Sequence, residues 1–257
     1  MAIHPTAIVA PGAQIDPSCE IGPYTVIGRM VKMGPRNVVG GHAVIDGDTT
    51  FGEANQVFPF ASIGQIPQDL KFRGEHTRLG IGSRNRFREF CTVHLGTEGG
   101  GGLTRVGSDC LLMANCHVAH DVQLGDGCIV GYSTGLGGHV VVEDRVIFSG
   151  LCAVHQHVRL GRLAFVSGGA MVAMDVAPYC TVQGDRAQLA GLNATGLERA
   201  GYSAEQIARV KEAYRITFRS GLKLQEAIAR MKAELGGHAE VDHFVGFVEK
   251  SERGLTR

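Results

Sequence analysis

The sequence predicts a parallel β-helix built from six-residue repeats, followed by a small helical domain. The first observation is an apolar residue at every sixth position through about two thirds of the 257 residues. The second is a series of small residues placed four positions after those apolar residues. The third is composition, because 37 glycines, no tryptophan and 6% aromatic residues suit many tight corners around a narrow core.

The six-residue repeat carries the fold prediction, because a period of six fits neither an isolated helix nor an alternating strand. It is typical of a solenoid in which each flat side is one hexad and three hexads make a triangular coil. Successive coils then stack at strand spacing, about 4.8 Å. The apolar positions are Ile3, Val9, Ile15, Ile21, Ile27, Met33, Val39, Ile45, Phe51, Val57, Ile63, Ile81, Phe87 and Val93, then every sixth residue from Val106 to Val172.

Most cysteines occupy the small-residue position of the repeat. They are Cys19, Cys91, Cys110, Cys116, Cys128 and Cys152, and alanine, threonine or asparagine takes the same position in other hexads. We therefore expect inward-facing thiols that fill the core, not ligands or nucleophiles. Seven cysteines without a CxxC pair also indicate a reducing compartment, and the cytoplasm is the predicted location.

Two stretches interrupt the repeat and predict loops that project from the coils, near residues 65–78 and 96–104. Loops on a rigid scaffold often carry function. The predicted β-helix domain covers residues 1–190, and the predicted helical domain covers residues 191–257. In the second domain, Ser203 and Gln206 form a capping-box pattern, and three segments then show apolar residues at helical spacing.

Charge and hydropathy exclude several classes of partner. Lysine plus arginine and aspartate plus glutamate are both 25, so no net charge favours nucleic acid or an anionic membrane. No apolar run approaches the roughly 18 residues that a membrane span needs. The first ten residues, MAIHPTAIVA, lack the basic and apolar regions of a signal peptide.

The 18-residue coil predicts which residues lie next to the stretch HVAHD (117–121). His120 stacks with Gly138 and Gln156 in one column of the solenoid, and Asp121 heads the adjacent column. Gly138 therefore lies about one strand spacing from His120. The residues expected to converge at this corner are His117, His120, Asp121, His139 and His155.

Three interpretations of this corner stay open from spacing alone. His120 fits a general base, with Asp121 as its orienting partner and the Gly138 N–H as an oxyanion donor. The histidines also fit a zinc site of the γ-class carbonic anhydrase type, which needs three histidine nitrogens at about 2.0–2.1 Å. They fit solvated surface residues as well.

Several stretches together closely resemble the UDP-N-acetylglucosamine O-acyltransferases of lipid A biosynthesis, over essentially the whole chain. The stretches are QDLKF (68–72), REFCTVHLGT (88–97), GGLTRVGSD (101–109), NCHVAHD (115–121), GGHV (137–140) and AVHQ (153–156), with the helical tail. NCHVAHD together with the QDLK loop is specific, whereas the hexads are shared by many acyltransferases.

The resemblance implies a cytoplasmic homotrimer of left-handed β-helices with active sites between subunits. It implies the first step of lipid A biosynthesis, transfer of an (R)-3-hydroxyacyl chain from acyl carrier protein to the 3-hydroxyl of UDP-N-acetylglucosamine. It implies no metal, and no cofactor beyond the phosphopantetheine arm that carries the donor. Since a thioester is already activated, positioning, proton removal and oxyanion stabilisation suffice without a covalent intermediate.

The family's functional residues carry over to positions of this sequence. The general base is His120, its partner is Asp121, and the oxyanion donor is the Gly138 N–H. The acyl-chain ruler is near Gly168, where glycine fits a longer chain and Phe165 would shorten the slot. The residues expected to contact or line the substrate are Gln68, Asp69, Lys71, His94, His117, His139, His155, Gln156, Gly168, Asn193 and Arg199.

The sequence also departs from the family pattern near the sugar nucleotide. Better-known members carry an acidic residue where Thr195 stands and a second basic residue where Ala200 stands. Some relatives acylate a 3-amino UDP-sugar instead, and this acceptor stays the alternative within the class. Those relatives usually carry an additional domain before the hexads, which here begin at Ile3.

The tail carries a possible docking surface for the carrier. Lys211, Arg215 and Arg219 recur every four residues and predict a basic stripe on one helix. Acyl carrier proteins are acidic, so this stripe fits carrier docking, and an ordinary solvated helix face fits it as well.

Overall fold

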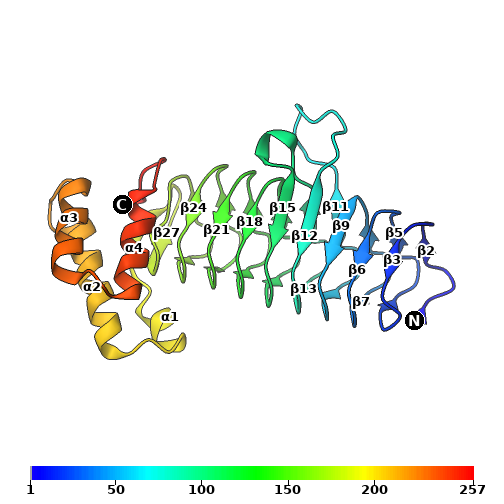
Figure 1. The fold of residues 1–257 in the computed structure, drawn as a ribbon, viewed down its shortest axis with the longest axis horizontal. Coiled ribbons are helices and arrows are strands. Elements are labelled where there is room, and N and C mark those ends of the chain that lie inside the picture. Colours follow the sequence, from blue (N-terminus) through cyan, green and yellow to red (C-terminus); the bar gives the residue numbers. More distant parts are fainter. Residues whose placement is uncertain (1) are drawn as a thin grey trace.

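The computed structural model describes residues 2–257 and confirms a left-handed parallel β-helix followed by helices (Figure 1). Three parallel sheets form the sides of a triangular prism, and we call them sheets A, B and C. The chain runs from A to B to C in each coil, so the prism has an A–B, a B–C and a C–A corner. Along the prism axis, strands of successive coils pair in register.

Most strands are only two residues long, as a six-residue side with a tight corner requires. Sheet A contains β1 (Ala2–Ile3), β4 (Glu20–Ile21), β7 (Val38–Val39), β10 (Gln56–Val57), β13 (Arg86–Phe87), β16 (Leu111–Leu112), β19 (Ile129–Val130), β22 (Ile147–Phe148), β25 (Phe165–Val166), β27 (Cys180–Gln183) and β28 (Gln188–Leu192). Sheet B contains β2 (Ile8–Val9), β5 (Val26–Ile27), β8 (Val44–Ile45), β11 (Ser62–Gln65), β14 (Thr92–His94), β17 (His117–Val118), β20 (Gly135–Leu136), β23 (Ala153–Val154) and β26 (Met171–Val172). Sheet C contains β3 (Gln14–Ile15), β6 (Lys32–Met33), β9 (Asp48–Phe51), β12 (Arg78–Ile81), β15 (Leu103–Val106), β18 (Gln123–Leu124), β21 (Val141–Val142) and β24 (Arg159–Leu160).

The core is the column of apolar side chains that the hexad count predicts. From Ile21 to Val172 every predicted apolar position is buried, whereas Ile3, Val9 and Ile15 are half-buried. The six predicted cysteines are buried, and Cys180 joins them. All seven thiols are free, and the burial of the six predicted cysteines confirms that the small-residue position of the repeat faces inward.

The corners require left-handed backbone even where the residue is not glycine. Asp121, His139 and His157 stack one above another at the B–C corner with φ of 61°, 61° and 64°. The His139 N–H donates to the His120 carbonyl at 3.1 Å, and the His157 N–H donates to the Gly138 carbonyl at 3.1 Å. Each corner is therefore tied to the coil before it, which offsets the steric cost of this conformation.

Two predicted loops leave the prism at the same B–C corner in consecutive coils (Figure 1). A regular coil spans 18 residues, as from Asn37 to Asn55. The next coil spans 30 residues, from Asn55 to Asn85, and the following one spans 25 residues, from Asn85 to Cys110. The extra residues lie between β11 and β12 and between β14 and β15, directly before the coil that carries His120.

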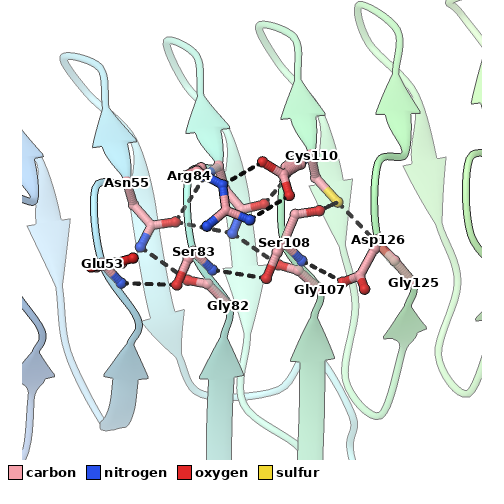
Figure 2. Close-up of polar contacts among 12 residues, drawn as sticks. Glu53, Asn55, Gly82, Ser83, Arg84, Gly107, Ser108, Cys110, Gly125 and Asp126 are labelled. Carbon is pink, nitrogen blue, oxygen red and sulfur yellow. Dashed lines mark hydrogen bonds and ion pairs between the residues drawn. The ribbon is translucent and has the colours of Figure 1, made fainter.

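Side-chain ladders connect successive coils at the C–A corner (Figure 2). The Ser83 N–H donates to Oγ of Ser108 at 3.1 Å, and the Ser108 N–H donates to Oδ1 of Asp126 at 2.7 Å. Inside the prism, Asn55 donates through Nδ2 to Gly82 O at 3.0 Å and accepts from the Asn85 N–H at 3.0 Å. Each buried amide thus satisfies groups on two neighbouring coils.

The carboxyl-terminal region forms four helices: α1 (Ala194–Arg199), α2 (Ala204–Arg219), α3 (Leu224–Leu235) and α4 (Ala239–Glu249). The capping box of Ser203 and Gln206 is confirmed at the start of α2. The sequence analysis missed α1 and the antiparallel pairing of β27 with β28. Within residues 2–257, no helix is long and apolar enough to cross a membrane.

Candidate active site

His120 and Asp121 form a buried pair at the B–C corner that follows β17. Nδ1 of His120 lies 2.8 Å from Oδ2 of Asp121, and the two residues are 7% and 4% exposed. Asp121 also accepts from the Thr97 N–H at 2.8 Å and from the Thr97 hydroxyl at 2.6 Å. A carboxylate with three donors holds the histidine proton on Nδ1, so Nε2 keeps its lone pair.

The support for Asp121 comes from the second projecting loop, and the sequence analysis did not single it out. Thr97 precedes the 3-10 turn η1 (Glu98–Gly100), and Oγ1 of Thr104 accepts the Asp121 N–H at 2.7 Å. A side chain at Gly100 would overlap the Asp121 carboxylate. The signal available in the sequence was the GTEGGGG run, whose glycines allow this close approach.

Gly138 lies against the His120 ring as the coil spacing predicts. A Cβ at this position would stand 2.6 Å from Nε2 of His120, so any larger residue would displace the ring. Among residues 2–257, the Gly138 N–H has no hydrogen-bond acceptor. A free N–H next to Nε2 has the placement that an oxyanion donor needs.

His139 completes the corner and joins it to His157. The rings of His120 and His139 meet edge to face at 5.0 Å, and those of His139 and His157 stack at 4.4 Å. Burial lowers the pKa of His139. His120, Asp121 and His139 also form the one group of potential metal ligands that lie close together in the described chain. It contains two histidines, not the three that the zinc interpretation requires.

His94 and His117 lie on sheet B beside this corner. Their rings meet edge to face at 4.8 Å, and Nδ1 of His117 lies 2.7 Å from Oγ1 of Thr92. Burial lowers the pKa of His94 to about 4, and burial also lowers the pKa of His117. Both imidazoles are therefore neutral near pH 7 and suited to hydrogen bonding rather than to charge pairing.

The two projecting loops meet over the histidines and enclose a cavity of about 330 Å³. Asp69 and Lys71 line it from the first loop, and His139 lines it from the B–C corner. The lining also includes Phe72, Glu75, Thr97, Glu98, Gly99 and His157. Gln68 is exposed on the same loop and does not line this cavity.

His155 departs from the expected cluster. It stands in the column next to His120, but its Nδ1 lies 3.3 Å from a guanidinium nitrogen of Arg253, near the carboxyl-terminal end. Arg253 also donates to the Ala173 carbonyl at 3.2 Å. His155 and the adjacent Gln156 are exposed, so of the four histidines expected to converge, this one faces the tail segment.

Three predicted residues lie on other corners of the prism. Gly168 follows β25 and is exposed at the A–B corner. Asn193 and Arg199 line a cavity of about 570 Å³ beside sheet A and the C–A corner. The Asn193 side chain also caps α1, accepting from the Gly196 N–H at 3.0 Å and donating to the Leu163 carbonyl at 2.8 Å. Within one chain, these three residues therefore lie at other corners of the prism than His120.

The repeat fold, the hydrogen-bonded dyad and the loop-covered cavity define a hexapeptide-repeat transferase. A model for "Bacterial transferase hexapeptide (six repeats)" matches residues 103–138, and one for "Udp N-acetylglucosamine O-acyltransferase; Domain 2" matches residues 175–256. The acyl-[acyl-carrier-protein]–UDP-N-acetylglucosamine O-acyltransferase of Anaeromyxobacter sp. (strain Fw109-5) is 61% identical over all of both chains. Its counterpart in Myxococcus xanthus (strain DK1622) is 60% identical over 99% of both.

Solved structures agree with these relatives. The UDP-N-acetylglucosamine O-acyltransferase of Moraxella catarrhalis superposes with a TM-score of 0.98 at 40% identity, and all of both chains are covered. The enzyme of Acinetobacter baumannii gives a TM-score of 0.97 at 39% identity, again over all of both chains. The chain belongs to the UDP-N-acetylglucosamine O-acyltransferase family, which confirms the resemblance inferred from its motifs.

Proposed function

We propose that the protein transfers an (R)-3-hydroxyacyl chain from acyl carrier protein to the 3-hydroxyl of UDP-N-acetylglucosamine, the first step of lipid A biosynthesis. The observation that carries this proposal is the His120–Asp121 pair beside the free Gly138 N–H. The printed names of the curated relatives supply the donor and acceptor classes.

His120 acts as the general base. Its Nε2 takes the proton of the sugar hydroxyl while the oxygen attacks the thioester carbonyl, and Asp121 stabilises the imidazolium that forms. The Gly138 N–H donates to the oxyanion of the tetrahedral intermediate. When the intermediate collapses, the thiol of the carrier leaves and receives the proton from His120. The balance needs neither metal nor redox cofactor.

Two cavities support part of the substrate-lining set, because Asp69, Lys71 and His139 line one and Asn193 and Arg199 line the other. The other assignments rest on the family resemblance. Asp69 and Lys71 hold the acceptor sugar over His139, and Gln68 reaches it from the tip of the same loop. His94 and His117 are the neutral hydrogen-bonding partners deeper in the cleft, and His155 and Gln156 line its far side. Asn193 and Arg199 hold the nucleotide, and Gly168 limits the acyl chain.

The division of these residues between corners supports a homotrimer. Asn193, Arg199 and Gly168 are far around the prism from His120, so a single site that uses all of them takes them from a neighbouring copy. Each copy would then contribute its B–C corner to one cleft, and Gly168 from its A–B corner and Asn193 and Arg199 from beside its C–A corner to other clefts. Size measurement by light scattering tests this, and a monomer with full activity would contradict it.

Carrier docking on α2 stays a proposal that rests on the basic stripe. Arg215 is held by Glu212 at 2.6 Å, and Arg219 lies 3.4 Å from the Tyr214 hydroxyl, while Lys211 has no partner among residues 2–257. The stripe therefore presents less free charge than the sequence predicts. Reversing the charge of Lys211 and Arg219 should raise the KM for acyl carrier protein, and an unchanged KM would contradict the docking proposal.

The direct test mixes the protein with UDP-N-acetylglucosamine and a set of 3-hydroxyacyl carrier proteins and follows acylation by mass spectrometry. His120→Ala should abolish the product, whereas His4→Ala, an exposed histidine of the first coil, should not change it. Product formed on the 3-amino UDP-sugar alone would replace the acceptor but keep the mechanism. No acyl transfer, together with stoichiometric zinc, would favour the carbonic anhydrase interpretation.

A further inference from the structure

The 570 Å³ cavity at the C–A corner combines an apolar surface with two cations. Arg199 enters it from α1, and Arg145 enters it from the corner between β21 and β22. The apolar part comes from the residues Ile147, Leu163, Phe165 and Leu192. A ligand with a planar or apolar portion and an anionic portion fits such a surface.

Arg145 is unpaired, and its column in the solenoid explains why. It has φ of 59° at the outward corner position, as Arg84 does farther up the same column of coils. Arg84 meets Asp109 in the next coil and forms a two-pronged ion pair with both contacts at 2.7 Å. Arg145 instead stands between Gly127 and Leu163 in this column, and neither carries a charge. Asp109, Asp126 and Asp144 line a neighbouring cavity with Arg145, but none of them forms an ion pair with it among residues 2–257.

The described residues 2–257 give the guanidinium of neither Arg145 nor Arg199 an ion pair or a hydrogen bond. Gly127 also leaves room beside Arg145, because a Cβ there would stand 3.3 Å from Cγ of the arginine. The side chain is therefore free to turn toward a ligand in the cavity.

Ala200 lines the same cavity and carries no charge, so Arg145 and Arg199 are its two cations. We infer that Arg145 binds the diphosphate of the sugar nucleotide in this cavity together with Arg199. This inference rests on the proposed function, since it assigns the nucleotide to this cavity.

The chemistry predicts an effect on binding rather than on the chemical step. A guanidinium contacts phosphate oxygens through paired N–H donors, and the contact is equally strong before and during acyl transfer. The cavity lies at a different corner from His120, so loss of Arg145 should raise the KM for the nucleotide and leave kcat unchanged.

Titration calorimetry with UDP, UMP and uridine tests the assignment without any acyl donor. Arg145→Gln should weaken UDP binding about tenfold and leave uridine binding unchanged, since one charge-assisted contact is lost. Arg29→Gln, an exposed arginine of an early coil, is the matched control and should bind as the wild type does. Unchanged UDP affinity in Arg145→Gln would overturn the inference.

Two further variants separate a ligand contact from a structural role. Arg145→Gln combined with Ala200→Arg should recover most of the UDP affinity, because the cation returns to the same cavity. Gly127→Asp should also weaken UDP binding, because it places a carboxylate beside Arg145 in the same cavity. Aspartate suits the φ of 65° at this position. Failure of the rescue would also count against the inference.

Solution size and acyl transfer complete the test. If Arg145→Gln dissociates the assembly and UDP affinity falls in step with dissociation, Arg145 binds a neighbouring copy and the inference is wrong. If the wild type binds UDP and shows the Arg145 dependence but transfers no acyl chain, the proposed reaction fails while the diphosphate assignment stands. A wild-type protein that binds no UDP overturns the assignment.

Discussion

The B–C and C–A corners share one backbone shape but use their polar side chains in opposite ways. At the C–A corner, Ser83, Ser108 and Asp126 each accept an N–H from the coil before, and the inner asparagines each accept one from the coil after. At the B–C corner, His120 bonds sideways to Asp121 and leaves its second nitrogen free. The first pattern satisfies the polar groups, and the second keeps one available for chemistry.

The insertions account for this difference. A ladder needs a polar side chain at the equivalent position one coil away, and the projecting loops interrupt this corner in the two coils before the one that carries His120. Four buried side-chain atoms have no partner among residues 2–257, and three of them belong to Gln65, Thr77 and His94, where the loops begin or end. Interrupting a regular repeat therefore creates unsatisfied polar groups, and these are the groups that a substrate can use.

The largest expected effect is a loss of catalytic rate at the B–C corner without a loss of stability. His120→Ala should lower kcat about 10³-fold, because a positioned general base contributes roughly 10²–10⁴. The midpoint of thermal unfolding should stay within a few degrees of the wild type, since His120 belongs to no ladder. Calorimetry on the same sample checks this, and a large loss of stability would show that the corner is structural.

The next largest effect is a loss of stability when the asparagine ladder at the C–A corner is interrupted. Asn55→Ala removes the amide that bonds Asn37, Gly82 and Asn85, leaving buried groups unpaired, at a cost of about 3 kcal/mol in the free energy of unfolding. Activity per folded molecule should not change. Gln56→Ala, the exposed neighbour, serves as the control in urea unfolding. Equal midpoints for the two variants would contradict the ladder argument.

A smaller effect concerns pH. Because burial lowers the pKa of His94 from 6.5 to about 4, the unfolded chain binds a proton between those values that the folded chain does not. The free energy of unfolding should therefore fall as the pH falls from 6.5 to 4, with His94 contributing about 1–3 kcal/mol. His94→Gln should flatten that part of the curve. An identical pH dependence in the variant would contradict a buried neutral imidazole.

The smallest effect concerns the exposed pair at the outer C–A corner. Arg84→Gln removes the ion pair with Asp109, both of whose side chains are about half exposed. Solvent screens such pairs, so the thermal midpoint should not move measurably. Differential scanning calorimetry at low and high salt checks this. A clearly lower thermal midpoint would show that the outer arginines help to hold the coils together.

The fold was predictable from the sequence because the repeat is strict. Each hexad places one apolar and one small residue inward. Ile21 and Cys19 in an early coil are therefore buried in the same way as Val172 and Cys152 in a late one. The dyad was predictable because His120 and Asp121 are adjacent in the sequence, and the nearby Gly138 was predictable because it stands one coil after His120. The sequence could not show the support from Thr97, since a loop of irregular length brings it to Asp121.

The sequence analysis was also incomplete where the repeat ends. The helix α1 is only six residues long and begins at Ala194, so too few apolar positions precede Ser203 to show a period. His155 was placed with the other histidines by counting, but counting fixes a column and not the direction of a side chain. Its contact with Arg253 depends on a segment 98 residues away.

Successive coils contain 18, 30 and 25 residues, yet each adds one strand to every sheet of the prism. Chain length and height are therefore independent, and a corner can gain or lose residues without shifting the phase of any later hexad. The B–C corner is therefore a suitable position for grafting loops in protein engineering. A loop of different length and sequence can be inserted there while the neighbouring coils keep their strand register. Substrate choice can change at this corner without redesign of the scaffold.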